Sequence, residues 1–283
     1  MNLSSKKLTT LDGLEVFTNL TYLDCSYNPL TSLDVSKLTE LTVLVCDGCF
    51  NSTPVSRSYA NGVLDLSANL KLQRLSCNNN QLTELILPAT ETLVSISCGY
   101  NQLATLDISK NIKLQELSCN ESSLTSLEVS NNTLLKELSL RYNQLTDIDL
   151  SANKELQTLD VLGNQLKELD LSQNLNLEKL YCSDNLLISL ILGQNTNLSF
   201  LECTNNRLVV LDISKNINIE KLACGSQNDA NDDSQELLLT INEEQRTRWE
   251  ENWKDNNYNV TISDKVFSVS GGNGSNFGNG GVF

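Results

Sequence analysis

Apolar residues recur along most of this chain in a pattern with a period of 21 residues. In the stretch 198–216 (LSFLECTNNRLVVLDISKN), apolar side chains stand five and two residues before Cys203, at Cys203, and five, eight and ten residues after it. We call the cysteine position 0 and number each repeat, or coil, from it. Position 0 of coils 1 to 10 is occupied by Cys25, Cys46, Cys77, Cys98, Cys119, Leu140, Val161, Cys182, Cys203 and Cys224.

A period of this length with the core L-x-x-L-x-[apolar]-x-x-N-x-L is typical of a leucine-rich repeat solenoid, in which each coil lays one short strand beside its neighbour's. A single coil buries too little apolar surface to offset the entropy lost on ordering it, so stability comes from stacking. We therefore predict a mainly β solenoid of the α/β repeat class, with a parallel sheet of about ten strands and covered ends.

The second coil carries a ten-residue insertion, because 31 residues separate Cys46 from Cys77 whereas every other step is 21. We place it in the loop 49–62, CFNSTPVSRSYANG. Its proline, glycine and hydroxyl residues predict a surface loop rather than an added helix or strand. The loop leaves the sheet close to the surface that a ligand would contact, and the sequence leaves open whether it takes part in binding.

Asparagine also recurs at two fixed positions. Each coil turns sharply after its strand, and a side-chain amide can satisfy the backbone groups that such a turn buries. We predict this role for position +3, with Cys49, Ser122 and Gln227 as exceptions, and a similar role in another turn for position +13. The two series are Asn28, Asn80, Asn101, Asn143, Asn164, Asn185 and Asn206, and Asn69, Asn111, Asn132, Asn153, Asn174, Asn195 and Asn216.

The cysteines also follow the repeat, and their position in it explains why the chain has so many. Eight of the nine stand at position 0 of successive strands, where Leu140 and Val161 replace them in two coils, so the thiol serves as a small buried apolar group. In-register side chains on parallel strands lie about 4.8 Å apart, whereas a disulfide favours Cβ atoms nearer 3.8 Å. We therefore expect free thiols along the ladder, and a buried loop thiol at Cys49.

The chain is strongly acidic, with 35 Asp and Glu against 20 Lys and Arg, a formal charge of −15 and a pI near 4.4. A polyanion repels nucleic acid and anionic membranes, so we expect neither as a partner. No apolar run approaches the roughly 20 residues that span a bilayer, and residues 1–20 lack the apolar core of a signal peptide. We expect no membrane insertion and a monomer.

The chain contains no histidine, which excludes Ser-His-Asp and Cys-His nucleophilic sites and every zinc site that uses histidine. Acidic residues recur at position +9, and we interpret this row as a solvated face rather than a calcium site. The spacing of Asp229, Asn231 and Asp233 resembles the start of a calcium loop, but Ser234 and Thr240 stand where such a loop needs Gly and Glu. We expect no enzymatic activity, no catalytic residues, no metal and no cofactor. The row consists of Asp34, Asp65, Asp107, Glu128, Asp149, Asp170 and Asp212.

The 21-residue repeats, the cysteine ladder and the motif L-D-[apolar]-S together resemble the internalin-type bacterial leucine-rich repeat proteins. The motif occurs as LDVS at 33–36, LDIS at 106–109 and 211–214, and LDLS at 169–172. The resemblance covers residues 8–227 and implies a right-handed curved solenoid with its parallel sheet on the concave face. Members of that family are typically exported surface proteins that use the repeat as a binding platform. The resemblance transfers no particular ligand.

The repeat pattern ends after Cys224. Residues 237–241 read as a strand, Asn242 and Gln245 form a reciprocal capping pair that begins a helix, and residues 260–267 read as a last strand. Trp249 and Trp253 share one face of that helix and are expected to cover the last coil. We therefore divide the chain into a solenoid at 1–227, a strand-helix-strand cap at 228–267, and a flexible Gly- and Asn-rich tail at 268–283.

Aromatic residues indicate where a partner would bind. Strand positions −3, −1 and +1 alternate with buried positions and face the concave side, with +2 at the rim. In four successive coils the large apolar residues step sideways, which predicts an exposed diagonal stripe with charged residues beside it, the usual composition of an interface hot spot. The predicted binding residues are Tyr142, Leu162, Tyr181 and Phe200 in the stripe, Asp160, Lys179 and Glu202 beside it, and Tyr100.

Two functions remain open. The leading hypothesis is a non-enzymatic binding or adhesion module, secreted or on a bacterial surface, that binds a host or cell-surface protein or a glycan on its concave face. The alternative is a structural or scaffolding leucine-rich repeat protein in the cytoplasm, where reduced cysteines are usual.

Overall fold

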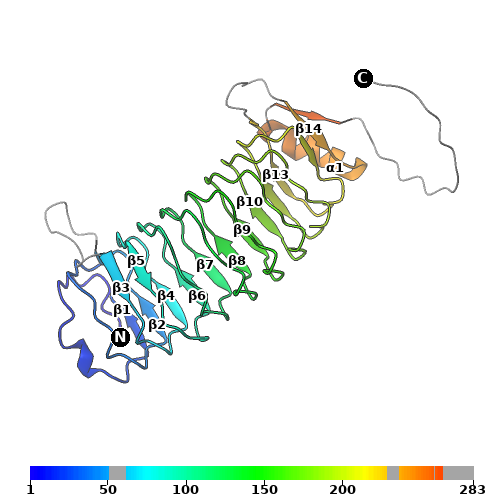
Figure 1. Cartoon of the computed structure of the whole chain (residues 1–283). Coiled ribbons are helices and arrows are strands. Elements are labelled where there is room, and N and C mark those ends of the chain that lie inside the picture. The colour runs from blue at the N-terminus through cyan, green and yellow to red at the C-terminus, as the bar shows by residue number, and fades with distance from the viewer. Residues whose placement is uncertain (51–61, 228–235, 258, 264–283) are drawn as a thin grey trace, which may run out of the picture.

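The computed structural model describes residues 1–50, 62–227, 236–257 and 259–263, which wind into one solenoid of stacked coils (Figure 1). Most of the insertion in coil 2, the residues Asp229, Asn231 and Asp233, and the predicted tail lie outside the described residues. The division of the chain at residues 227 and 267 stays a prediction.

One parallel sheet of ten strands runs the length of the solenoid and confirms the predicted architecture. Its strands pair in register at the same coil positions, and Leu44 pairs with Leu75, which places the insertion as predicted. In sheet order the strands are β1 (Tyr22–Asp24), β2 (Val43–Val45), β4 (Arg74–Ser76), β6 (Ser95–Ser97), β7 (Glu116–Ser118), β8 (Glu137–Ser139), β9 (Thr158–Asp160), β10 (Lys179–Tyr181), β11 (Phe200–Glu202) and β13 (Lys221–Ala223).

Two smaller parallel sheets form at positions +7 to +9 of some coils. One pairs β3 (Val63–Asp65) with β5 (Glu84–Ile86), and the other orders β12 (Val210–Asp212), β14 (Leu237–Thr240) and β15 (Val260–Ile262). Helical structure in the described residues is limited to the 3-10 helix η1 (Leu14–Val16) and three short elements near the C-terminus. These are the α-helix α1 (Glu243–Arg248), the π-helix η3 (Trp249–Trp253) and the 3-10 helix η4 (Lys254–Asn256). None of them is long and apolar enough to cross a membrane.

The core is a continuous column of the periodic apolar residues. The strand residues at position −2 and the residues at position 0 point into it, so Leu180 and Cys182 are fully buried, while Lys179, next to Leu180 on the same strand, is exposed. All nine cysteines are free and buried, including Cys49, as the sequence predicted. Burial raises the pKa of the thiols of Cys46, Cys77 and Cys203 well above its usual value, and that of Cys224 to about 12.

These thiols should not react in the folded protein, because all nine are buried and shielded from solvent. Titration with an aromatic disulfide reagent is expected to label all nine cysteines in denaturant and almost none without it. Rapid labelling of several ladder thiols in native protein would contradict the arrangement described here.

Both asparagine series form the hydrogen-bonded ladders that the sequence predicted. At position +3, Asn185 Nδ2 donates to Cys182 O of its own coil at 3.2 Å and to Val161 O of the preceding coil at 2.9 Å. At position +13, Asn174 Nδ2 donates to two carbonyls of the preceding coil, Leu150 O and Asn153 O, at 3.1 and 2.8 Å. The amides therefore bind each coil to the one before it.

Two of the exceptions at position +3 perform the same role. Gln227 Nε2 donates to Cys203 O and Cys224 O, both at 2.9 Å, and its Oε1 accepts from Leu208 N at 3.0 Å. Cys49 donates through its thiol to Cys25 O at 3.1 Å. Glutamine or cysteine can thus take the place of asparagine at position +3 of a coil.

The acidic residues at position +9 belong to turns. Each accepts a hydrogen bond from the backbone N–H two residues further on, as Asp149 does from Ser151 at 2.9 Å. Hydrogen bonds from the same serine lower the pKa of Asp149, and matching bonds lower that of Asp34, Asp107, Glu128 and Asp170. Within the described residues, no three acidic or cysteine side chains are close enough together to hold a metal ion. The motif L-D-[apolar]-S is therefore a turn motif.

The C-terminal elements replace the hydrogen bonds that an eleventh coil would make. Asn257 accepts from Cys224 N at 2.5 Å and donates to Leu222 O at 3.2 Å, as a strand peptide would do. Gln245 Nε2 donates to Ile213 O and Asn216 O at 2.9 and 3.0 Å, the pattern of an asparagine at position +13. The side chains of Gln245 and Asn242 also complete the predicted capping box of α1.

The two tryptophans of η3 are buried, as predicted, with exposed fractions of 4% for Trp249 and 2% for Trp253. The indole N–H of Trp253 donates to Glu220 O at 3.0 Å. Glu220 O would otherwise accept a backbone N–H from a following coil, because that is its role in the coils before it. The open edge of β13 is thus closed by the side chains of Trp253 and Asn257.

Candidate functional site

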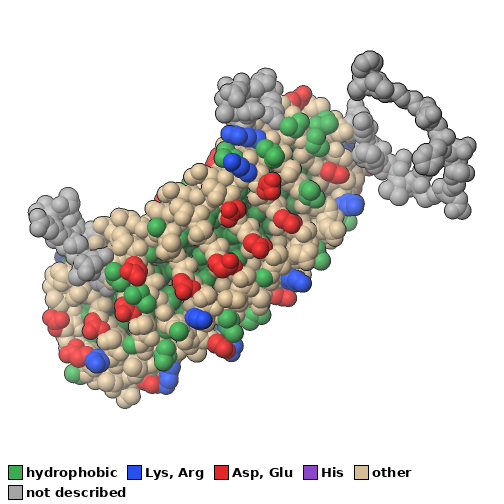
Figure 2. All heavy atoms as spheres, in the orientation of Figure 1, with side chains coloured by type: hydrophobic (Ala, Val, Ile, Leu, Met, Phe, Trp, Pro, Cys, Tyr) green, Lys and Arg blue, Asp and Glu red, His purple; other side chains and the backbone are tan. Residues whose placement is uncertain are grey.

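The concave face is the outer surface of the ten-stranded sheet, built from positions −3, −1 and +1 of each coil with +2 at its rim. Along each strand the central residue is buried and its neighbours are more exposed, as in β10 and β11. Side chains from successive coils therefore stand in rows about 4.8 Å apart. In the view of Figure 2, acidic side chains run along the length of the visible face, and Lys and Arg are fewer.

Two of the predicted binding residues form an aromatic pair. The ring centroids of Tyr181, on β10, and Phe200, on β11, lie 4.5 Å apart with the ring planes tilted by 33°. Their strands pair with Lys179 opposite Phe200 and Tyr181 opposite Glu202, so the two rings meet diagonally across the ladder. Both rings are partly exposed. Tilted pairs of this kind stabilise their own geometry by about 0.5–1.5 kcal/mol beyond the burial of area.

Arg141 joins this pair from two coils away. Its guanidinium forms an ion pair with the Asp160 carboxylate of coil 7 and lies over the Tyr181 ring of coil 8, with the Arg141 Cζ atom 5.6 Å from the ring centroid. A cation over an aromatic face is attracted by the ring quadrupole. We call Arg141, Asp160, Tyr181 and Phe200 the aromatic cluster. Sequence reasoning missed Arg141, although its position +1 places it on the concave face.

The expectation that Leu162 and Asp160 are exposed is wrong. Leu162 is 8% exposed and Asp160 is 7% exposed, so neither presents a free side chain to a partner. Arg141 reaches from coil 6 to Tyr181 in coil 8 and so covers coil 7, which lies between them. The predicted diagonal stripe is therefore interrupted at coil 7, where the guanidinium of Arg141 forms the surface instead.

Burial changes the chemistry of the Asp160 carboxyl group. Its loss of contact with water raises the pKa, and the nearby Arg141 guanidinium and the Leu162 N–H, at 3.4 Å from Oδ1, oppose this increase without cancelling it. The carboxylate is thus held in place by a charge and a backbone donor. Its main effect is to fix the position of Arg141 over Tyr181.

The remaining predicted residues surround the cluster or lie apart from it. Lys179 is exposed beside Phe200, and Glu202 accepts a hydrogen bond from Ser183 Oγ at 3.4 Å. Tyr142 is 51% exposed, and its ring covers the backbone of coil 7, because a Cβ atom on Gly163 would lie 2.4 Å from Tyr142 Cδ1. Tyr100 belongs to coil 4 and hydrogen bonds to Glu121, which raises the pKa of the tyrosine.

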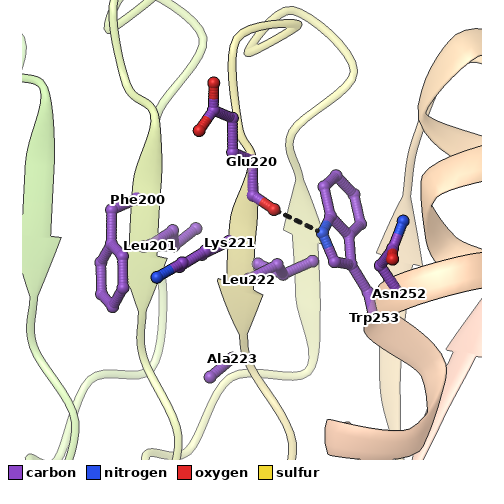
Figure 3. A pocket seen from close by; sticks show the side chains of 8 residues that line it. All are labelled: Phe200, Leu201, Glu220, Lys221, Leu222, Ala223, Asn252 and Trp253. Atoms are coloured by element: carbon purple, nitrogen blue, oxygen red, sulfur yellow. Dashed lines mark hydrogen bonds between the residues drawn. The ribbon is translucent and has the colours of Figure 1, made fainter.

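A hollow of about 400 Å³ continues the concave face beyond Phe200 (Figure 3). It lies between Phe200 on one side and Trp253 of η3 on the other, and Figure 3 shows the Lys221 ammonium extending toward Phe200. Ala223 is small, so the floor of the hollow is open there. Sequence reasoning placed Trp253 in the cap but did not place it beside Phe200.

Comparisons with known proteins support the assignment of leucine-rich repeats. A family model for leucine-rich repeats in two copies matches residues 133–174, and a model for a single leucine-rich repeat matches residues 19–41. A search of curated proteins finds no match.

Solved structures resemble the chain more extensively. The functional domain of InlJ from Listeria monocytogenes, which includes a cysteine ladder, is 29% identical with a TM-score of 0.45 over 82% of this chain, and the chain spans only 66% of that domain. The internalin InlF from Listeria monocytogenes is 20% identical, with a TM-score of 0.63 over 98% of this chain and 86% of InlF. The Toll–Spatzle complex of Drosophila gives 20% identity and a TM-score of 0.62 over 85% of this chain and 40% of that one.

The family models and the InlF likeness agree with the geometry of the ten stacked strands. The chain has the leucine-rich repeat fold, which InlF shares, and is built from 21-residue coils around a ladder of buried cysteines.

Proposed function

We propose that this protein is a non-enzymatic binding or adhesion module whose protein partner docks over the aromatic cluster. The observation that carries the proposal is the contact of Arg141, Tyr181 and Phe200 on the exposed side of the sheet. Aromatic and arginine side chains are the residues most enriched in interface hot spots. The solenoid core does not need them there, because the leucines behind the strands already fill it.

The cluster is also pre-organised for binding. Asp160 fixes Arg141, Arg141 lies over Tyr181, and Tyr181 contacts Phe200, so each ring is positioned before a partner arrives. Ordering a side chain on binding costs about 0.5–1.5 kcal/mol, and a pre-formed cluster avoids that cost. The hollow between Phe200 and Trp253 has room for one large apolar side chain of the partner.

We further propose that the protein acts outside the bacterial cell or on its surface, as a monomer that binds a host or cell-surface protein. The likeness to internalins supports this location, and the Toll–Spatzle complex is an example of the same fold bound to a protein. The nine free cysteines favour the alternative, a scaffolding protein of the reducing cytoplasm. Fractionation of the native cells with an antibody against this chain distinguishes the two locations.

Truncation of the two rings is expected to weaken partner binding. A partner captured on immobilised protein and then purified should bind Tyr181→Ala and Phe200→Ala with affinities lower by roughly 1–3 kcal/mol each, because their rings form the exposed part of the cluster. Biolayer interferometry measures the dissociation constants, and thermal melting checks the fold.

The matched control is Tyr22→Ala, which removes an exposed ring at position −3 of coil 1, five or more coils away from the cluster. We expect no change in affinity for this variant. If the Tyr181→Ala/Phe200→Ala double variant bound the partner as tightly as the parent protein, the aromatic cluster would not be the binding site.

A further inference from the structure

A second surface of different chemistry lies on the concave face of coils 1 to 5. It is a hollow of about 390 Å³, which we call the polar trough, and its main lining residues are Tyr27, Asp47, Asn78, Ser97, Tyr100 and Asn120. Tyr27 of coil 1 and Tyr100 of coil 4 line the trough together with carboxylate, amide and hydroxyl groups. The trough has no large aliphatic residue among those that line it.

Hydrogen bonds hold the floor of the trough in place. The Asp47 carboxylate accepts from Ser76 Oγ at 2.8 Å and from Asn78 N at 2.7 Å, which joins coil 2 to coil 3. Asn78 Oδ1 in turn accepts from Ser97 Oγ at 2.9 Å and from Gly99 N at 2.8 Å. Each polar group therefore has a fixed orientation before any ligand binds.

Hydrogen-bonding capacity remains for a ligand. Most of the bonds to Asp47 converge on Oδ1, while Oδ2 accepts from Ser76 Oγ at 2.9 Å, so lone pairs of the carboxylate are left over. In the described part of the chain, the Asn120 amide uses one of its two N–H groups, on Ser118 Oγ at 3.2 Å. The trough thus presents an acceptor in coil 2 and a donor in coil 5.

Gly99 gives the trough its depth. A Cβ atom at this residue would lie 2.9 Å from Asn120 O and 3.5 Å from Asn78 Oδ1, so a side chain would both clash with the backbone and fill the floor. The glycine keeps a gap between the amides of Asn78 and Asn120.

The two tyrosines occupy positions that their side chains do not favour. Tyr27 and Tyr100 stand at position +2 with φ of 55° and 54°, in the left-handed region, where a non-glycine residue is strained by roughly 1–2 kcal/mol. Gly48, Asn79 and Asn205 hold the same position in other coils, and these residue types tolerate that backbone. Tyr27 and Tyr100 are 64% and 56% exposed, so burial in the core does not explain why tyrosine stands at these two positions. Strained residues of this kind concentrate at binding sites.

The chemistry of the trough selects one class of ligand. We propose that the polar trough binds a short neutral oligosaccharide, with a sugar ring stacked on Tyr27 and on Tyr100 and its hydroxyl groups on Asp47 and Asn120. Tyrosine offers an apolar face to the C–H face of a sugar and a polar tip to water. A carboxylate accepts hydrogen bonds from sugar hydroxyl groups, and an amide N–H donates to a hydroxyl oxygen. The two tyrosines lie three coils apart, roughly 14 Å at about 4.8 Å per strand, which suits an extended chain rather than a single sugar.

Other ligands fit the trough less well. A protein hot spot needs an apolar pocket that excludes water, whereas this floor consists of hydroxyl and amide groups. The net charge of −15 and the Asp47 carboxylate repel polyanions and acidic sugars. The inference does not depend on the proposed protein partner, because it uses other residues.

The test uses cellotriose, maltotriose and triacetylchitotriose as neutral probes, with sialyllactose as an acidic probe, in saturation-transfer NMR and calorimetry on the whole chain. We expect at least one neutral probe to bind, and to bind more tightly than sialyllactose. Tyr27→Ala and Tyr100→Asn should each weaken that binding roughly tenfold, a difference of about 1.4 kcal/mol. Phe17→Ala, which removes an exposed ring before β1, should leave it unchanged.

Thermal melting separates binding from folding. Because asparagine tolerates the left-handed backbone, Tyr100→Asn should keep or raise the melting temperature, by up to about 2–4 °C, while it weakens sugar binding. The proposal is overturned if no neutral probe binds at millimolar concentration, if sialyllactose binds as tightly as the best neutral probe, or if the Tyr27→Ala/Tyr100→Asn double variant binds like the parent protein.

Discussion

The Asn185→Ala variant is expected to lose about 3–6 kcal/mol of unfolding free energy, because it removes four buried hydrogen bonds and leaves the N–H of Leu166 without its acceptor. Asn185 Nδ2 donates to Val161 O, Cys182 O and Ser183 O at 2.9, 3.2 and 3.1 Å, and its Oδ1 accepts from Leu166 N at 3.0 Å. The side chain is only 5% exposed, so water cannot replace these bonds without opening the coil. Equilibrium urea unfolding followed by circular dichroism measures the loss.

Two variants serve as controls for Asn185→Ala. Asn197→Ala removes an exposed asparagine that makes one bond, to Leu175 O at 3.2 Å, and should change the unfolding free energy by no more than about 0.5 kcal/mol. Asn185→Ser should fall between the two, because serine holds this position in coil 5 as Ser122. A loss below about 1 kcal/mol for Asn185→Ala would mean that the ladder does not hold the coils together.

Replacement of Gln245 by alanine is expected to lower the unfolding free energy by about 2–4 kcal/mol, although the residue lies outside the repeats. Gln245 is fully buried and satisfies Ile213 O and Asn216 O, the last carbonyls of the position +13 ladder. The variant also removes the bond from Asn242 N to Gln245 Oε1, at 3.0 Å, and so weakens the start of α1. Hydrogen exchange should show the loss first in coils 9 and 10, since each coil is stabilised by its neighbours.

Gln194→Ala is the matched control for Gln245→Ala, because Gln194 is an exposed glutamine of a surface turn. Its stability should equal that of the parent protein. Gln245→Glu keeps an acceptor for Asn242 N but loses both donors, so it should resemble Gln245→Ala. If Gln245→Glu were as stable as the parent protein, the two carbonyls would not depend on this side chain.

The fold could be predicted from the sequence because one short pattern is repeated ten times. Cys46 and Cys77 alone located the insertion, and Leu140 and Val161 showed that the thiols are buried apolar groups. The role of Gln245 as the last rung could not be predicted in this way. It depends on how α1 lies against coil 9, and no periodicity extends into that helix.

The candidate site was predicted only in part. Strand alternation gives the direction of a side chain, so it located Tyr181 and Phe200, but it does not say what covers a side chain. Leu162 was misplaced for that reason, since its position +1 points outward but its side chain is only 8% exposed. Gly48 and Asn79 at position +2 were a signal that this position has a left-handed backbone, which makes the tyrosines there unusual.

The number of coils between the polar trough and the aromatic cluster sets the distance between these two surfaces. Asn120 Oδ1, at the edge of the trough, accepts the N–H of Arg141 in the cluster at 2.8 Å, and the same register is kept on both sides of this bond. Since each coil pairs only with its neighbours, a duplicated 21-residue coil inserted there would leave both surfaces intact and separate them by one more strand spacing, about 4.8 Å. The distance between the two surfaces can therefore change only in whole steps, and gene duplication of single coils supplies those steps.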